Sequence, residues 1–540
     1  MRPAGRAVTD SLYFAYPHFD PPLDRSKLSD PAPVAIVGAG PVGMTAALAL
    51  ARAGVASVLF DAKATFNDGS RAICIARQSY HILERLGALA PFLEKSLGWT
   101  TGRSFFRGRQ ILEFHMPDGP QEKFRPMYNI EQQYIEQYLW EAIAREPLIE
   151  ARWQSKVTGM KDVPGGVRLD VSDPEGSYSL TAGWLLAADG ARSTVRSLRG
   201  LRLKGENFEG RYVIADVQMD HDYPTIRRAL FDPDCRRGGT ILVHRQPDNI
   251  WRIDYQLRDG EDEEEATREE NVRASVAAVL AEIGHTGDWE LEWWSIYSAN
   301  TLALDDYRDG RVFFIGDSAH IVPIFGVRGL NNGIADADNI AWKLARVIKG
   351  TSGETLLDSY TPERRGATLD VFANATKSAR FMTPPTPGWQ LMRDAALNLA
   401  LSHPFAGDLA NPRQMTPYTY ADSPVVSADD PDFTSGPVPG ATLPEARVGD
   451  RFLSDLLGPG FTLITFDEDL AEKLTGLGIA IVKLQPGSEA AETLAAGPSS
   501  AYLVRPDLHI AGRWLKASPE TVRAALNLAT AGGCHERQGS

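Results

Sequence analysis

A glycine-rich turn near the beginning of the sequence limits the fold more than any other feature. The apolar run 34–37 is typical of a strand, and the motif GAGPVG at 38–43 follows it directly. A helical pattern comes next, and a second strand-like run at 55–60 ends at Asp61. A strand, a tight turn, a helix and another strand form a βαβ unit, whose two strands are parallel. We therefore predict an α/β fold built on a parallel sheet.

The three glycines of this turn fit the binding of a dinucleotide. Gly38 permits the tight turn, Gly40 lets the backbone approach a pyrophosphate, and Gly43 allows the helix to pack closely on the strand. The helix N-terminus adds N–H donors and a positive potential. Asp61 closes the next strand, where a carboxylate can accept hydrogen bonds from ribose hydroxyls. The spacing does not distinguish NAD from FAD.

Length and charge restrict the class of protein. The chain has 540 residues, too many for one hydrophobic core, and a net charge of −14. This charge disfavours broad binding to nucleic acid or to anionic membranes, and no apolar run is long enough to span a bilayer. The three cysteines form no CxxC pair, so we expect neither a disulfide framework nor a metal site. The first 30 residues lack the apolar core of a signal peptide, and a cytoplasmic location is expected.

The pattern along the chain predicts several parts. Residues 1–30 are expected to be an irregular leader, and 31–390 the dinucleotide-binding domain. Short strand-like runs at about 204–300 indicate an antiparallel sheet inserted into that domain. Pro, Asp and Ser accumulate at 391–440, which favours a connector. Strand and helix patterns alternate again at 441–540, so a second, small α/β domain is predicted.

A second glycine-containing segment lies at 311–344. An apolar run ends at Gly316-Asp317, and Gly329 follows at the start of a helix-like pattern. A strand that carries a carboxylate at its C-terminal end and is followed by a helix N-terminus is suited to an extended cofactor.

Three segments together resemble the single-component FAD-dependent aromatic hydroxylases, the p-hydroxybenzoate hydroxylase-like flavoprotein monooxygenases. The fingerprint at 38–43 is the first. WLLAADGARSTVR at 184–196 matches the DG motif of that family, and the segment beginning at Gly316-Asp317 matches its GD motif. NIEQxxxE at 129–136 and LLDSYTPERR at 356–365 are also similar to the family.

The C-terminal residues 441–540 resemble the thioredoxin-like tail of the larger, phenol-hydroxylase-type members, without a redox cysteine pair. The resemblance thus implies an α/β architecture in three parts. A Rossmann-type FAD-binding domain would contain an inserted antiparallel β-sheet substrate domain, and a thioredoxin-like α/β domain would follow. The last domain would have a structural role, in domain packing or at a dimer interface.

The resemblance implies FAD as the cofactor. Asp61 would bind the adenosine ribose, Arg71 and Gln132 the pyrophosphate and ribityl regions, and Asp317 the ribityl chain. Backbone N–H groups of the next helix would face the pyrimidine edge of the flavin. Asp189 and Arg196 of the DG motif would serve FAD and the nicotinamide donor, or form a structural ion pair. The implied FAD-binding residues are Gly38, Gly40, Gly43, Asp61, Arg71, Gln132, Asp189, Gly190, Gly316, Asp317, Gly329, Leu330 and Asn331.

The chain departs from the family's GD motif at three positions. Ile324 replaces a proline whose carbonyl would lie beside the flavin and the substrate, and Val327-Arg328 replaces Gly-Gln. Contacts at these positions are therefore not transferred from the family.

The activity implied by the resemblance is hydroxylation of a phenolic or related aromatic substrate through a C4a-hydroperoxyflavin, with O2 and NADH or NADPH consumed. The alternatives are another flavin enzyme on the same fold, such as a reductase or a halogenase, and a non-catalytic interaction protein. The WxWxIP segment of halogenases is absent, and an intact GD motif disfavours a non-catalytic protein. The aromatic substrate, its regiochemistry, the choice of nicotinamide donor and the existence of a homodimer remain open.

Candidate catalytic residues lie on the expected inserted sheet. On the strand 251–257, Arg252 and Asp254 share one face, opposite Tyr255, and one of these faces should cover the flavin. His244 on the preceding strand is a further candidate, as are Tyr212 and Tyr297. We expect His320 to fix its loop. The candidates for orienting or deprotonating the substrate are Asp254, Arg252, Tyr255 and His244.

Overall fold

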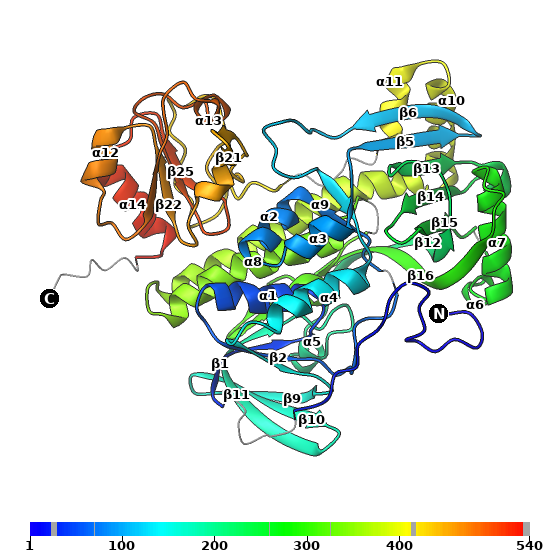
Figure 1. Cartoon of the computed structure of the whole chain (residues 1–540), viewed down its shortest axis with the longest axis horizontal. Coiled ribbons are helices and arrows are strands. Elements are labelled where there is room, and N and C mark those ends of the chain that lie inside the picture. Colours follow the sequence, from blue (N-terminus) through cyan, green and yellow to red (C-terminus); the bar gives the residue numbers. More distant parts are fainter. Residues whose placement is uncertain (23–29, 70, 259, 324–325, 412–416, 533–540) are drawn as a thin grey trace.

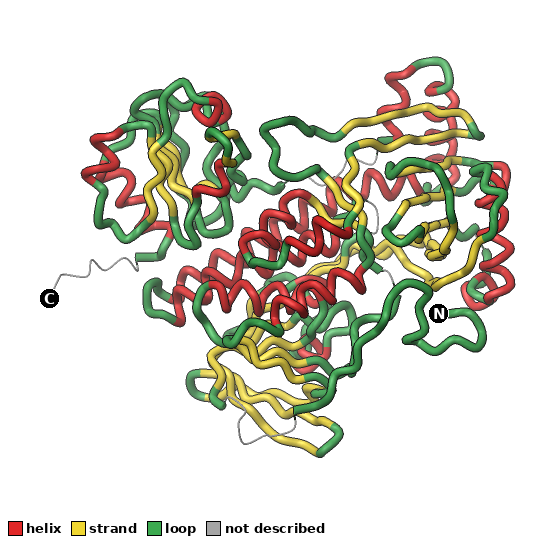
Figure 2. Tube along the Cα trace, in the orientation of Figure 1, coloured by secondary structure: helices red, strands yellow, loops and turns green. Residues whose placement is uncertain are grey.

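The computed structural model describes residues 1–22, 30–69, 71–258, 260–323, 326–411 and 417–532. Figure 1 shows three parts: a parallel sheet covered by helices, a second sheet to the right, and a smaller C-terminal unit to the left. In Figure 2 the strands fall into separate groups with helices between them. No helix among the described residues is long and apolar enough to cross a membrane.

The first sheet is the predicted parallel one. Strand β1 (Ala32–Val37) pairs in parallel with β2 (Ser57–Phe60) and with β11 (Gly176–Ala187). Strands β8 (Ile149–Arg152) and β18 (Val312–Phe314) extend the sheet in parallel on its two sides. Nearly every residue of β1, β2 and β18 is buried, as expected for parallel strands covered on both faces. The sheet also contains the antiparallel strands β9 (Lys156–Val163), β10 (Gly166–Asp173) and β17 (Arg308–Asp309).

Helix α1 (Pro41–Arg52) connects β1 to β2, so the predicted βαβ unit is confirmed. Its alanine-rich sequence is buried on almost all sides, because it packs against both the sheet and α8 (Gly329–Ile348). Helix α9 (Tyr360–Met382) lies beside α8 (Figure 1). The remaining elements of this part are β3 (Cys74–Ala76), α2 (Arg77–Arg85), α3 (Ala90–Lys95), β4 (Leu97–Trp99), β7 (Met127–Asn129), α4 (Gln132–Ile143) and α5 (Thr194–Leu198).

The second sheet contains all the strands that the sequence predicted between 204 and 300. The sheet has more strands than were predicted. Strands β5 and β6, from residues 101–115, form one edge, and β13 lies between them and the predicted strands. Helix α7 (Glu269–Glu282) packs on one face. The strands, in their order across the sheet, are β19 (His320–Ile321), β16 (Trp289–Ala303), β12 (Lys204–Met219), β15 (Ile250–Gln256), β14 (Thr240–Arg245), β13 (Arg227–Phe231), β5 (Thr101–Phe106) and β6 (Arg109–His115).

The expected connector differs from the prediction at its start. Helix α10 (Pro387–Ala400) runs into it, because Thr386 caps the helix and Pro387 fits the first helical position. Leu397 and Ala400 pack against apolar residues of the second sheet, and α11 (Pro404–Gly407) follows. The leader is mostly irregular, as predicted, yet it is anchored. The guanidinium of Arg2 lies 2.6 Å from Glu292 of β16.

The C-terminal unit contains a small sheet with helices around it. Strand β22 (Thr462–Thr465) pairs in parallel with β23 (Ala480–Lys483), and β24 (Ala501–Val504) and β25 (Ile510–Trp514) continue the sheet in antiparallel fashion. Its thioredoxin-like character remains a prediction. The other elements are β20 (Arg447–Val448), β21 (Arg451–Phe452), α12 (Glu468–Lys473), α13 (Glu489–Thr493) and α14 (Pro519–Ala529), and α6 (Glu263–Ala266) precedes α7 in the second part.

Candidate functional site

The glycine turn places the N-terminus of α1 at an open space. Gly38 has φ +106°, and a Cβ there would collide with the carbonyl oxygen of Ala188. A Cβ at Gly43 would collide with the Gly38 carbonyl, so both positions require glycine. At Gly40, by contrast, the nearest atom to an added Cβ is 3.8 Å away. No side chain caps α1, which leaves its first N–H groups available to an anion.

Asp61 lies beside this turn at the end of β2. One carboxylate oxygen accepts the N–H of Ala39 at 2.9 Å, and the other accepts the N–H of Lys63 at 2.9 Å. These bonds hold the carboxylate next to the glycine turn and leave lone pairs for a ribose hydroxyl.

Two further predicted residues lie on the segments after β2. Gln132 begins α4, accepts the N–H of Ala72 at 3.2 Å and donates to Glu136 at 2.7 Å. Its side chain is therefore engaged within the protein. Arg71 is exposed, and its positive charge opposes the effect of burial on the pKa of Asp317.

The GD turn lies at the C-terminal end of β18 in the first sheet. A 3-10 turn at Gly316–Ser318 follows β18, and Ser318 Oγ donates to the carbonyl of Ala187 at 2.5 Å. The Asp317 side chain is exposed, yet desolvation by the surrounding protein raises the pKa of its carboxyl group. Both statements hold if the carboxylate faces a narrow recess that water enters and protein surrounds. No protein hydrogen bond to this carboxylate occurs within the described residues.

The DG motif is hydrogen-bonded to the GD turn. Asp189 accepts from Ser193 Oγ at 2.6 Å and from the N–H of Val195 at 3.0 Å, and Ser193 caps α5 by accepting the N–H of Arg196. Arg196 donates to the carbonyl of Ser318 at 3.0 Å. Within the described chain the two motifs are thus joined by Arg196, whereas Asp189 and Arg196 do not form a direct ion pair. Gly190 has φ +77° and faces open space.

The N-terminal part of α8 packs against the GD turn. No side chain caps the helix, so the N–H groups of its first residues, Gly329 and Leu330 among them, have no capping acceptor in the described chain. Asn331 accepts the N–H of Ala76 at 2.8 Å and the hydroxyl of Ser79 at 2.7 Å, so its side chain joins α8 to β3 and α2. Two uncapped helix N-termini and the Asp317 carboxylate are groups that fit a dinucleotide with a ribityl chain.

One departure from the family motif has a structural consequence. Val327 has φ +60°, a conformation that costs a β-branched residue about 1–3 kcal/mol and that glycine adopts freely. Arg328 is buried and donates to the carbonyl of Val371 at 3.3 Å. Ile324, the third departure, lies outside the described residues.

A row of buried polar side chains crosses the second sheet. The register pairs His244 with Arg252 and Arg252 with Asp216, and the pair Arg228–Val243 places Arg227 opposite His244. Strand spacing puts neighbouring members of this row about 5 Å apart at the backbone. Asp254 lies one position further on the same face, and all are less than 7% exposed.

Arg252 joins the row to the segment at Arg71. Arg252 donates to the carbonyl of Arg71 at 3.5 Å and to the Asp254 carboxylate at 2.8 Å. Arg71 in turn acts electrostatically on Asp317, so Arg71 lies between the row and the Asp317 turn in this chain of interactions.

Burial controls the charges in the row. It lowers the pKa of Arg227 to about 10, against the attraction of Asp254, and the Nη2 atom of Arg227 is enclosed without a partner among the described residues. Burial, then Arg227 and Arg252, hold the pKa of His244 well below its ordinary value. The row therefore contains the arginines Arg227 and Arg252, the acids Asp216 and Asp254, the second of which is salt-bridged to Arg252, and a His244 imidazole that is neutral at neutral pH.

The other predicted candidates lie elsewhere. Tyr255 points to the opposite face and packs under α7 with Ile253, so it does not meet the row. Tyr212 forms a hydrogen bond of 2.7 Å with Thr383 and anchors the end of α9. Tyr297 donates to the carbonyl of Val322 at 2.8 Å. His320 lies 2.6 Å from Asp336, which agrees with the expected loop-fixing role.

Arg227 was missed because the strand β13 was not predicted. The signal was a pair of arginines at 227–228 entering the apolar run 229–231, where alternation must turn one arginine inward.

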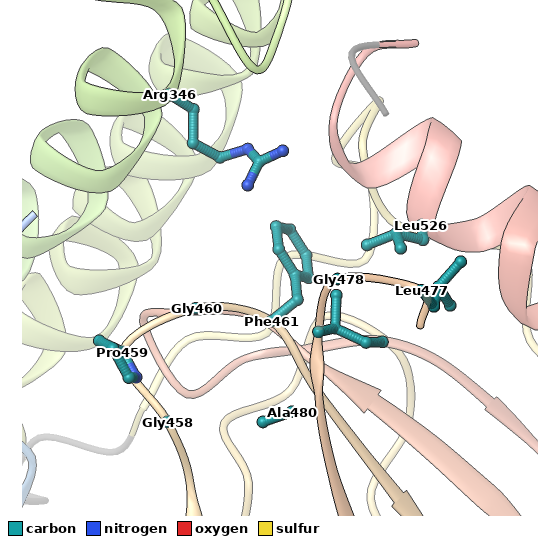
Figure 3. Close-up of a pocket in the computed structure, with 10 residues that line it drawn as sticks. Arg346, Gly458, Pro459, Gly460, Phe461, Leu477, Gly478, Ala480 and Leu526 are labelled. Atoms are coloured by element: carbon teal, nitrogen blue, oxygen red, sulfur yellow. The ribbon is translucent and has the colours of Figure 1, made fainter. Parts of the chain in front are cut away.

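A cavity of about 240 Å³ lies away from these motifs, between α8 and the C-terminal unit (Figure 3). It is lined by Arg346, the turn 458–461 and Leu526. Arg346 is the one charged group among its described lining residues, and it donates to Ser352 at 2.9 Å. The cavity lacks an acid–base pair and is no part of the candidate site.

Comparison with known proteins gives consistent matches. The family model described as "FAD binding domain" matches residues 31–375. Proteins named 3-(3-hydroxy-phenyl)propionate/3-hydroxycinnamic acid hydroxylase are similar over most of the chain. The one from Mycolicibacterium smegmatis is 25% identical over 81% of this chain and 77% of its own length. The one from Burkholderia cenocepacia is 28% identical over 80% and 78%.

Solved structures also match. The complex of aklavinone-11 hydroxylase with FAD and aklavinone has a TM-score of 0.75 at 22% identity, and covers 93% of this chain and 100% of that one. The p-nitrophenol 4-monooxygenase of Pseudomonas putida has a TM-score of 0.60 at 25% identity, and covers 72% of this chain and 100% of that one.

Proposed function

Because the chain belongs to the FAD binding domain family, we propose that it is an FAD-dependent monooxygenase that hydroxylates a phenolic or related aromatic substrate. NADH or NADPH would be the electron donor and O2 the source of oxygen. The observation that carries the proposal is the row of buried polar side chains on the second sheet, which Arg252 links through Arg71 to the turn at Asp317. The names of the hydroxylase relatives support the same reading.

FAD, when bound, supplies the redox chemistry that activates O2 and delivers one oxygen atom to the ring. Asp61 and the N-terminus of α1 would hold its adenosine and pyrophosphate parts. Asp317 would hold the ribityl chain, and the N-terminus of α8 the pyrimidine edge. The absence of side-chain caps on both helices and the glycines at 38, 40 and 43 fit these roles.

His244 is the proposed partner of the ring hydroxyl. Its imidazole is neutral at neutral pH, so one ring nitrogen can accept a hydrogen bond from the phenol. The guanidinium groups of Arg227 and Arg252 favour a negative charge nearby, which makes the bound ring more phenolate-like and more reactive. Because these residues are buried, water is kept from the reacting atoms. Asp254 would fix the orientation of Arg252.

Arg227 is the proposed binding group for an acidic substituent of the substrate. A buried guanidinium whose nitrogen has no hydrogen-bond partner lowers the stability of the protein unless a bound anion accepts a hydrogen bond from it. A carboxylate is the anion that matches its two parallel N–H donors. The relatives named for a propionate and a cinnamic acid carry this group on their substrates. We therefore propose a phenolic acid as the substrate.

A substrate screen tests the proposal. The purified protein, loaded with FAD, would be given NADH or NADPH and pairs of phenols that differ only in a carboxylate. We expect consumption of the nicotinamide to rise with phenolic acids, and a hydroxylated product to form in amounts close to that consumption. Measurement of H2O2 separates hydroxylation from uncoupled oxidation. If no aromatic compound stimulates the reaction, or if products require halide, the proposal is wrong.

We also propose that the protein forms a homodimer through α10 and α11. Leu391 and Met392 of α10, Phe405 of α11 and Leu409 of the turn that follows are each more than 60% exposed, which is unusual for large apolar side chains so close together in sequence. A second copy of the chain would cover this surface.

A further inference from the structure

The segment LLDSYTPERR is explained neither by cofactor binding nor by the chemistry at the second sheet. Its Glu363 and Arg364 are neighbours in the first turn of α9, and both are buried. Figure 1 shows α8 and α9 side by side, with the C-terminal unit near one end of the pair. The two side chains reach different parts of the molecule, and each ends in a network of charged hydrogen bonds.

Glu363 binds the C-terminal unit. Arg505 donates from both terminal nitrogens to the two Glu363 oxygens, at 2.7 and 2.9 Å. Asp507 accepts from the same guanidinium at 2.6 and 3.0 Å. Lys343 of α8 donates to Glu363 at 2.6 Å. The side chains of Arg505, Glu363 and Lys343 are fully buried, and that of Asp507 almost so.

Arg364 is linked through Asp336 to the turn that carries Asp317. Its Nε donates to Asp336 at 2.7 Å. The other oxygen of Asp336 accepts the backbone N–H of Gly316 at 3.0 Å and the ring nitrogen of His320 at 2.6 Å. Gly316 directly precedes Asp317, so Asp336 fixes the backbone from which that carboxylate projects.

A second contact joins the two networks. Arg364 donates to the hydroxyl of Tyr420 at 2.8 Å, and the Tyr420 ring stacks on His509 of the C-terminal unit at 4.3 Å. The C-terminal unit therefore contacts Glu363 directly and is linked to Arg364 through Tyr420 of the connector. Removal of one member of a buried ion pair strongly destabilises a protein, because it leaves an uncompensated charge where little water can solvate it. A substitution at Arg505 therefore removes the ion-pair partner of Glu363, and the adjacent Arg364 should shift with Glu363.

We propose that the C-terminal unit is a positioning element of the FAD recess, and that Arg505 acts on the Gly316–Asp317 turn through Glu363, Arg364 and Asp336. Arg505 is a positioning residue in this scheme and has no contact with the recess itself. The inference gives the C-terminal unit a role in cofactor binding beyond packing. It rests on the fit of the recess to FAD and is independent of the substrate.

The test compares Arg505 with another buried, ion-paired arginine of the same unit that has no hydrogen bond or ion pair to α9 among the described residues. Arg513 is buried in the C-terminal unit and binds Asp429 at 2.7 and 2.8 Å and the carbonyl of Phe433 at 2.7 Å. Full-length Arg505→Met, Arg505→Lys, Arg513→Met and Arg513→Lys would be freed of FAD and titrated with it, with the quenching of flavin fluorescence as signal. Hydrogen exchange of residues 314–320 would be followed in parallel.

We expect Arg505→Met to raise the Kd of FAD at least about tenfold and to accelerate exchange at 314–320. Arg505→Lys keeps the charge and should recover part of both effects. The Arg513 variants should lower the stability of the C-terminal unit and leave the Kd within about twofold of wild type. Equal Kd values for the Arg505 and Arg513 variants, or unchanged exchange at 314–320, would overturn the proposal. If Arg505→Met does not fold, the comparison of the two lysine variants decides.

Discussion

Replacement of Arg227 by methionine should make the protein more stable and a poorer enzyme. Burial lowers the pKa of Arg227 from 12.5 to about 10, which corresponds to a penalty of about 3 kcal/mol for holding the cation in the free protein. Methionine has a similar length and no charge, so Arg227→Met removes this penalty. We expect the free energy of unfolding to rise by up to about 3 kcal/mol at neutral pH.

The effect on the substrate has the opposite sign. A carboxylate bound to a buried guanidinium contributes about 2 kcal/mol or more, so kcat/KM for a phenolic acid should fall at least about 30-fold. A phenol without the carboxylate does not use this interaction. Its kcat/KM should change by less than about threefold, since the proposed partner of the ring hydroxyl, His244, is retained.

The assays are denaturant unfolding of the substrate-free protein and steady-state kinetics with two phenols that differ only in the carboxylate. Arg228→Met is the matched control. Arg228 is the next residue of the same strand, and it points to the other side, over the rings of Tyr223 and Phe105. A destabilised Arg227→Met variant that loses activity equally toward both phenols would refute the reasoning and make Arg227 a structural residue.

Other predictions concern the site, the pH dependence and the surface. Asp254→Ala should lower hydroxylation and raise H2O2 formation, because Arg252 loses its 2.8 Å partner; unchanged coupling would remove Asp254 from the site. Val327→Gly should change the free energy of unfolding by less than about 1 kcal/mol. Relief of the φ strain at Val327 offsets the packing that is lost and the greater chain entropy of glycine in the unfolded state. A loss above about 2 kcal/mol in urea unfolding would show that no strain is stored at this position. Arg505 holds the pKa of Glu363 and of Asp507 below their ordinary values of 4.5 and 3.8. The stability that these carboxylates contribute is present above those values and lost as the pH falls below about 4, so acid unfolding should begin there and be less steep in Arg505→Met. Leu391→Glu should convert a dimer into monomers in analytical ultracentrifugation, whereas a wild-type monomer would contradict the proposed interface.

The sequence by itself determined the local framework of the dinucleotide site. The β1–turn–α1–β2 unit and Asp61 lie within 30 residues of one another, and glycine spacing and apolar periodicity specify such units because their geometry is local. The turn at Gly316-Asp317 was recognised for the same reason. The assignment of FAD rather than NAD needed the resemblance of three separated motifs, which the match of the FAD binding domain model to residues 31–375 supports.

Only the tertiary structure decided which side chains meet. Arg227, His244 and Arg252 form a row because three strands pair in one register, and a shift by one residue would turn one of them to the other face. Glu363 and Arg505 are 142 residues apart, and neither residue type signals burial in sequence, because charged side chains are ordinarily exposed. Tyr255 could not be placed for the same reason: alternation defines two faces of a strand, and only packing decides which face meets α7 and which meets the recess.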